Sequence, residues 1–415
     1  MKKPNKKRTW WTRALGAGAM LTVSAVAAAG ILPSMSEKPM AAWSMVYGTE
    51  MAQASMIKLF GIAQPGYQYV QSDKGNVTTS GAQFKLYRMR AGIRGAISPN
   101  IDYYFLAQFD DHSPGTSSAS LFNATVTLNY IPGAHVIVGQ MMAPFADEGV
   151  TPAGVLPWVN YSPMTYNIGY NENTVASLPN GNGGANVGAG LFNSARERGV
   201  MIFDQFRGGM ASVDYALGYY NGTGVHENAS SMGHPDEFLG HVGAGLGPFD
   251  MSVGYVGAHQ TISGAVYQQK KLSFDLHYGN YTKDPFWLWY EYQHANDTQP
   301  ATANGNGLAR GWFAAGGIRP VKHFMAVLRY STYNAENVLA VSTNGTNSSP
   351  TAPVFGATPA TTSLNEESVI GIYLAPKGVR YLLELDRTTF NNTSQPAADA
   401  VSVMLSVPFG ARLVS

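Results

Sequence analysis

Apolar and polar residues alternate along segments of about ten residues through most of the chain, which is the period of a β-strand with one apolar face. The final segment, 401–409, is the clearest, because every second residue is apolar and Ser402 and Ser406 lie between them. Segments 101–109 and 272–278 alternate in the same way. One-sided apolar strands of this kind predict an all-β, transmembrane antiparallel barrel with lipid outside and a polar lumen inside.

The links between these segments alternate in length. Short links rich in Pro, Gly and Asn separate longer polar links, which include 72–83, 259–267 and the much longer 144–195. Counting the links predicts about sixteen strands, an even number as in closed bacterial barrels, with short periplasmic turns and long extracellular loops. We therefore expect the barrel to occupy residues 57–409 and residues 410–415 to form a C-terminal extension.

The first 29 residues predict a cleaved secretory signal peptide. Six basic residues precede an apolar run from Ala14 to Leu32 that is rich in small residues and is too short for a comfortable membrane-spanning helix. Small residues allow cleavage after Ala29, with Ala54 as the alternative site. Residues 30–56 would then be a short periplasmic segment, and the protein would reach the bacterial outer membrane after secretion through the inner membrane.

Composition agrees with a chain that faces lipid and excludes several classes of function. Charged residues make up 13% of the chain, against about 25% in soluble proteins. The absence of cysteine excludes disulfides, thiolate nucleophiles and cysteine-ligated metals. Loss of the signal peptide leaves 21 basic and 26 acidic residues, a net charge of −5, which excludes a nucleic-acid partner. A soluble β-sandwich or propeller is the alternative fold, although neither requires links that alternate so regularly.

Several short segments resemble the phosphate-selective porin family of outer-membrane channels. Residues 88–95, with the sequence RMRAGIRG, and residues 98–104 carry the first part of this resemblance. Residues 138–145 resemble the segment that leads into the family's constriction loop, and residues 196–200 and 215–222 resemble the strands that follow.

The resemblance implies a sixteen-stranded porin, usually a homotrimer, for passive diffusion of small hydrophilic solutes or inorganic ions. Outer-membrane lipid and lipopolysaccharide would surround it. The third long loop, 144–195 here, would fold into the lumen and set its narrowest point. The constriction would then contain these residues of the loop: Asp147, Glu148, Trp158, Tyr161 and Glu172. In contrast to the family, residues 139–195 contain no Lys or Arg, so the sequence leaves a phosphate preference open.

Arg88, Arg90 and Arg94 share one face of a predicted strand, opposite an apolar face that includes Tyr87. If the apolar face meets lipid, the three guanidinium groups form a ladder in the lumen. Such a ladder attracts anions, as rings of charge do in selective pores. Alternatively, acidic residues of neighbouring strands or of the long loop neutralise it, and the loop offers Asp147, Glu148 and Glu172. The same argument places three further basic residues in the lumen: Lys271, Arg329 and Arg380.

No motif points to catalysis, a cofactor or a metal. The chain lacks a G-x-S-x-G elbow, an H-E-x-x-H helix, a P-loop and a dinucleotide-binding fingerprint, so we expect no enzymatic activity. His and acidic residues between His226 and Glu237 match no metal-ligand template. The remaining alternatives are an adhesin or structural barrel, suggested by long Asn-, Ser- and Thr-rich loops, and a hydrolase whose site is assembled from separate strands.

Overall fold

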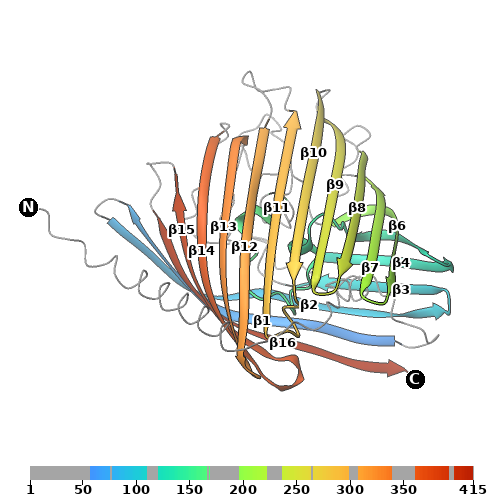
Figure 1. The fold of residues 1–415 in the computed structure, drawn as a ribbon, viewed down its shortest axis with the longest axis horizontal. Coiled ribbons are helices and arrows are strands. Elements are labelled where there is room, and N and C mark those ends of the chain that lie inside the picture. Colours follow the sequence, from blue (N-terminus) through green and yellow to red (C-terminus); the bar gives the residue numbers. More distant parts are fainter. Residues whose placement is uncertain are drawn as a thin grey trace, which may run out of the picture.

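Sixteen antiparallel strands form a closed barrel in the computed structural model. Each strand pairs with its neighbours in the chain, and the first strand closes the ring on the last (Figure 1). The predicted fold is therefore confirmed. Among the described residues, no helix has the length and apolar character needed to cross a membrane. The structure describes residues 57–74, 77–109, 120–165, 168, 196–221, 236–262, 265–298, 307–338, 360–391 and 397–414.

The first eight strands are β1 (Ile57–Lys74), β2 (Val77–Ser98), β3 (Ile101–Gln108), β4 (Ser120–Ile131), β5 (Ala134–Met142), β6 (Arg196–Gly208), β7 (Ala211–Tyr220) and β8 (Asp236–Leu246). The other eight are β9 (Phe249–Ile262), β10 (Ala265–Tyr278), β11 (Phe286–Thr298), β12 (Gly307–Val321), β13 (Phe324–Val338), β14 (Ala360–Leu374), β15 (Arg380–Phe390) and β16 (Ala398–Val414). The short helical elements are α3 (Asp147–Val150) and the 3-10 turn η4 (Pro376–Gly378), and residues 163–165 are also helical.

The two faces of the barrel differ in polarity, as the alternating pattern predicts. Val253, Leu383 and Val403 lie on the outer face and are each 46% exposed. Ser273 and Glu384 lie on the inner face and are fully buried. Because the strands close into a ring, neighbouring strands pair their backbone groups, which lipid could not hydrogen-bond.

The structure corrects three of the predicted boundaries. β1 and β2 remain paired as far as Lys74 and Val77, and β9 and β10 remain paired as far as Ile262 and Ala265, so two of the expected long loops are tight links. At the other end, β16 continues to Val414, which pairs with β1, so residues 410–414 are not an extension. The physical reason is that β1 begins at residue 57 and its first residues need backbone partners.

A bulge in β2 changes the orientation of one predicted side chain. Tyr87 has no cross-strand partner in β1 at the point where Pro65 interrupts that strand. Proline has no N–H to donate, so a bulge is favoured there. Tyr87 consequently turns inward, is 3% exposed and packs over Gly66. The prediction that Tyr87 faces lipid is wrong, whereas Arg88 and Arg90 do face the lumen.

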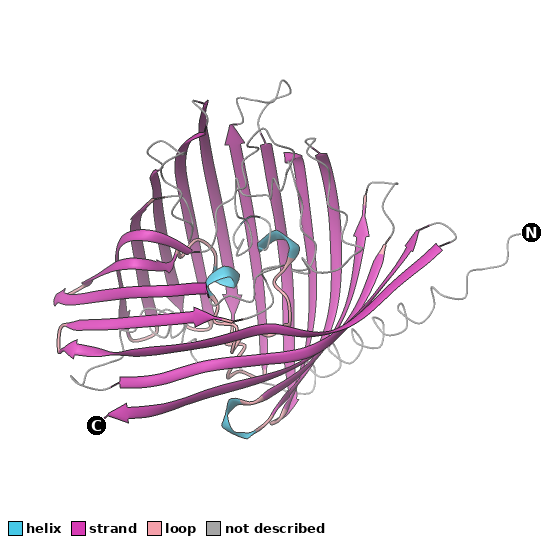
Figure 2. Cartoon of the chain, turned by 180° about the vertical axis from the view of Figure 1, so that it is seen from behind, coloured by secondary structure: helices cyan, strands magenta, loops and turns pink. Residues whose placement is uncertain are grey.

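After β5 the chain turns into the barrel. Residues 143–165, which we call the lumen segment, lie within the ring of strands and include α3 (Figure 2). The segment is almost entirely buried. Several predictions concern residues outside those that the structure describes. These residues are the predicted signal peptide, the segment 30–56, and the part of loop 144–195 after residue 165 apart from residue 168, which includes Glu172.

Candidate functional site

Acidic side chains of the barrel wall hold the lumen segment through its backbone N–H groups. The Oε2 atom of Glu384 accepts hydrogen bonds from the N–H groups of Val159, at 2.7 Å, and Asn160, at 3.3 Å. On β11, four strands from Glu384 on β15, Glu291 accepts a bond from the N–H of Glu148 at 2.7 Å. Hydrogen bonds to a carboxylate are stronger than those between neutral groups, so these contacts fix the course of the segment.

Basic side chains of the wall bind the carbonyl groups of the same segment. Arg380 donates to the carbonyl oxygens of Leu156 and Ala153, at 2.9 and 3.1 Å. Arg329 donates to the carbonyl oxygen of Asn160 at 2.9 Å. Arg329 and Arg380 therefore face inward, but their guanidinium groups are covered by the segment. The prediction that these two residues line an open pore is corrected accordingly.

Arg329 is also the centre of a buried ion cluster. Its guanidinium group lies 2.7 Å from Glu366, 3.4 Å from Glu384 and 3.7 Å from Glu148. All four side chains are at most 1% exposed. Glu148 belongs to the lumen segment and the other residues to three different strands, so the cluster ties the segment to the wall.

The two described acids of the loop have partners on the barrel wall and within the lumen segment. Asp147 lies 2.9 Å from the Nε2 atom of His277 on β10. Glu148 accepts hydrogen bonds from the N–H and hydroxyl groups of Ser162, at 2.9 and 2.5 Å, and lies beside Arg329. Both acids anchor the segment to itself and to the wall.

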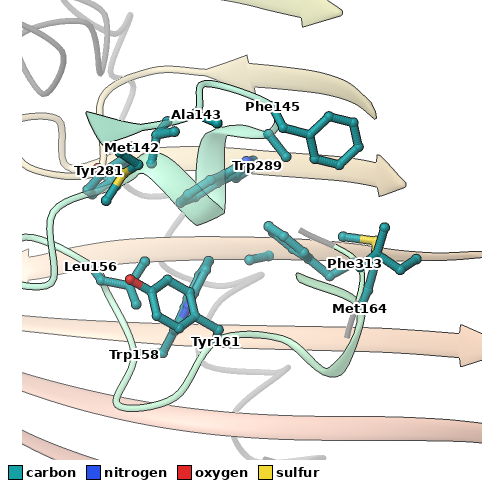
Figure 3. Close-up of a cluster of buried hydrophobic side chains, with 14 of the residues drawn as sticks. Met142, Ala143, Phe145, Leu156, Trp158, Tyr161, Met164, Tyr281, Trp289 and Phe313 are labelled. Carbon is teal, nitrogen blue, oxygen red and sulfur yellow. The ribbon is translucent and has the colours of Figure 1, made fainter. Parts of the chain in front are cut away.

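Aromatic packing covers the other face of the lumen segment. The ring of Trp158 lies 5.2 Å from that of Trp289 on β11 and 5.5 Å from that of Phe313 on β12 (Figure 3). Tyr281, in the turn between β10 and β11, stacks on Trp289 at 5.6 Å. Burial raises the pKa of the Tyr281 phenol to about 12, so it stays protonated at neutral pH. Each such aromatic pair stabilises the packing by about 0.5–1.5 kcal/mol beyond the contribution of the apolar area that it buries.

The arginine ladder lies on the inner face of β2. Arg88 donates to the carbonyl oxygen of Val159 and to the side-chain oxygen of Gln64, both at 3.1 Å. Its guanidinium group also lies 5.2 Å from the centre of the Tyr161 ring. Arg88 is 7% exposed, so the lumen segment covers it as it covers Arg380, and the ladder begins at this contact.

Further along β2, the ladder is bordered by aromatic rings. The guanidinium group of Arg90 lies 4.1 Å from the ring centre of Phe122, and that of Arg196 lies 3.0 Å from it. The guanidinium group of Arg94 lies 5.5 Å from the ring centre of Phe60. Cation–π contacts of this kind help to hold the guanidinium groups in place. Lys271 also points inward, 5.8 Å from the ring centre of Phe145 on the lumen segment.

The sequence analysis did not single out the acidic residues of the wall that hold the lumen segment, either directly or, for Glu366, through Arg329. The alternation of polar and apolar residues could have indicated them, because each lies on the polar face of its strand. The same alternation predicted that the arginines face the lumen. The residues concerned are Asp275, Glu291, Glu366 and Glu384.

A family model of Gram-negative porins matches residues 16–358. The chain belongs to the Gram-negative porin family. It is therefore a channel protein of the bacterial outer membrane, and the prediction of a porin is confirmed at this level. The family and the fold are typical of channels rather than of enzymes. No curated protein matches the chain by sequence at a significant level.

Solved structures of other outer-membrane proteins share the fold of this porin. The anion-selective porin of Comamonas acidovorans superposes with a TM-score of 0.60 at 13% identity, covering 85% of this chain and 99% of the other. The channel DcaP of Acinetobacter baumannii gives 0.53 at 10% identity, with coverages of 85% and 97%. The trimer form of OmpT from Vibrio cholerae gives 0.51 at 10% identity, with coverages of 86% and 100%.

The close approach of the lumen segment to β9 provides a test of its position. A side chain at Gly254 would overlap the carbonyl oxygen of Phe145, so we expect Gly254→Leu to displace the segment and change the single-channel conductance of the porin. Gly240→Leu is the matched control, because a Cβ atom there has no neighbour closer than 3.8 Å. Equal conductance in the two folded variants and the parent protein, measured in planar bilayers, would contradict the described packing.

Proposed function

We propose that this porin is an anion-preferring channel for small hydrophilic solutes or inorganic ions, with residues 144–195 as its constriction. The observation that carries the proposal is the ladder of Arg88, Arg90 and Arg94 on the inner face of β2, in contact with the lumen segment at Val159. Arginine stays charged at every physiological pH, so the ladder is a permanent source of positive potential.

Two further observations support an anion preference. Asp147 and Glu148 bind His277, Ser162 and Arg329, so these acids serve as anchors of the segment. In addition, a porin of the same fold, from Comamonas acidovorans, is described as anion-selective.

The trimer form of the Vibrio cholerae protein, together with the family resemblance, supports a homotrimer for this chain. Light scattering of the detergent-solubilised porin measures its mass directly.

Inorganic phosphate is one of the anions that the channel is proposed to admit. Residues 88–95 resemble the phosphate-selective porins and contain the whole ladder. The segment entering the loop contains Met141 and Met142 and no basic residue, so we propose a general anion preference rather than a phosphate-specific site.

Reversal potentials in a salt gradient test the proposal. The parent porin is expected to prefer chloride over potassium, because the ladder raises the anion concentration in the lumen. The triple variant Arg88→Gln, Arg90→Gln, Arg94→Gln is expected to lose most of this preference. Replacing Arg207 and Arg310, which are exposed, by Gln removes charge elsewhere and is expected to leave the reversal potential unchanged.

Arg88 also supports the lumen segment, so conductance must be recorded beside selectivity. A change in conductance alone reports displacement of the segment, whereas a shift in reversal potential at constant conductance reports the charge of the ladder. A cation preference in the parent, or an intact anion preference in the triple variant, would refute the proposal. Addition of phosphate to one side then shows whether it competes with chloride for the same path.

A further inference from the structure

Three potential metal ligands meet where the lumen segment contacts β10. Asp275 and His277 lie two residues apart on the inner face of β10, and Asp147 is the first residue of α3. One ligand atom from each lies within 4.8 Å of the other two. Asp275 is fully buried, His277 is 2% exposed and Asp147 is 9% exposed.

Two further acidic side chains lie beside these three residues on the neighbouring strands. Asp275 lies directly opposite Glu291 across the β10–β11 pair, and like charges in such positions repel. The hydrogen bonds that Asp275 accepts from the N–H of Asp147 and the hydroxyl of Ser252 are both 3.4 Å long. Asp275 and Glu291 also share a side-chain hydrogen bond, so the two acids form a close buried pair. On the other side, His277 lies opposite Asp250 in the β9–β10 pair.

We propose that Asp147, Asp275 and His277 bind a divalent metal ion that fastens the lumen segment to the barrel wall. Two carboxylates and one imidazole suit a transition ion such as Zn²⁺, whereas Ca²⁺ and Mg²⁺ prefer oxygen ligands alone. The ring of His277 packs 4.7 Å from that of Trp289, which holds the imidazole in position. Glu291 is close enough to Asp275 to serve as a further ligand or to orient it.

This inference is independent of the anion preference, because it concerns the attachment of the segment rather than the charge of the open lumen. A bound ion would join two parts of the chain that are 130 residues apart, Asp147 and His277. It would also place a positive charge beside the paired carboxyl groups of Asp275 and Glu291. The segment should therefore be held more firmly when the ion is present.

Zn²⁺ titration of the chelator-treated, full-length porin tests the site. We expect one Zn²⁺ per chain by calorimetry, weaker binding of Ca²⁺, and a rise in the thermal unfolding temperature as Zn²⁺ binds. Asp275→Asn and His277→Gln should each weaken Zn²⁺ binding at least about tenfold. His241→Gln is the matched control, because His241 is also a buried lumen residue beside an aspartate, with its Nε2 atom 3.3 Å from Asp214. It should leave Zn²⁺ binding unchanged.

The melting temperature of Asp275→Asn, measured with and without a chelator, distinguishes two explanations of the cluster. One is a metal site, and the other is a pair of acids that repel each other. Without metal, removing one carboxylate relieves the repulsion from Glu291, so the variant should melt at or above the parent temperature. With Zn²⁺ present, the parent should melt higher. Absence of stoichiometric Zn²⁺ binding in the folded parent would overturn the proposal. Equal Zn²⁺ affinity in the parent, Asp275→Asn and His277→Gln would also overturn it, because the ion would then be bound elsewhere.

Discussion

Single-channel conductance is expected to rise severalfold when residues 146–192 of this porin are replaced by a short Gly-Ser linker. The lumen segment fills part of the ring and is held there by Glu384, Arg380 and Arg329, so its removal widens the path for ions. The barrel should still close, because Met142 and Arg196 are cross-strand partners and a short linker can join their strands. The charged groups that the segment covered would then meet the water of the channel.

Deletion of the link 339–359, between β13 and β14, is the control for this experiment. It removes a long link at the same end of the barrel, and the conductance should stay close to that of the parent. Planar-bilayer recordings of heat-modifiable, assembled protein provide the measurement. An unchanged conductance after removal of residues 146–192 would show that these residues do not set the narrowest point.

Arg329→Met is expected to reduce the free energy of unfolding by about 3–5 kcal/mol, the usual cost of removing one partner from a buried ion pair. Methionine has a similar length but no charge, so Glu148, Glu366 and Glu384 would remain buried around an apolar side chain. The loss should appear as a lower midpoint in denaturant-induced unfolding of the detergent-solubilised porin. Because Glu148 belongs to the lumen segment, the variant should also show a noisier current.

Arg387→Met is the matched control on the neighbouring strand pair. Arg387 is 27% exposed and lies 4.0 Å from Asp399, so its loss should cost no more than about 1 kcal/mol. Adding Glu366→Gln to Arg329→Met should recover part of the stability, because it removes one of the stranded charges. A stability of Arg329→Met equal to that of the Arg387→Met control would show that the cluster does not stabilise the barrel.

The barrel itself could be predicted from the sequence because the residues of each strand alternate between the lipid and the lumen, and this alternation is visible within the strand. Alternation at 401–409 and 272–278 reports lipid on one side and the lumen on the other, and it needs no knowledge of distant residues. The same parity placed Arg88 and Arg90 on the inner face of their strand. Tyr87 was misplaced because a single bulge reverses the parity of the residues before it.

The partners of the lumen charges were decided by the tertiary structure alone. Val159 and Glu384 are 225 residues apart, and Asp147 and His277 are 130 apart, so no local pattern relates them. Strand parity shows that a charged side chain points inward, but the curvature of the ring and the path of the lumen segment determine which charge it meets. For this reason the sequence could assign Arg329 to the lumen, whereas only the folded barrel showed that it anchors the segment.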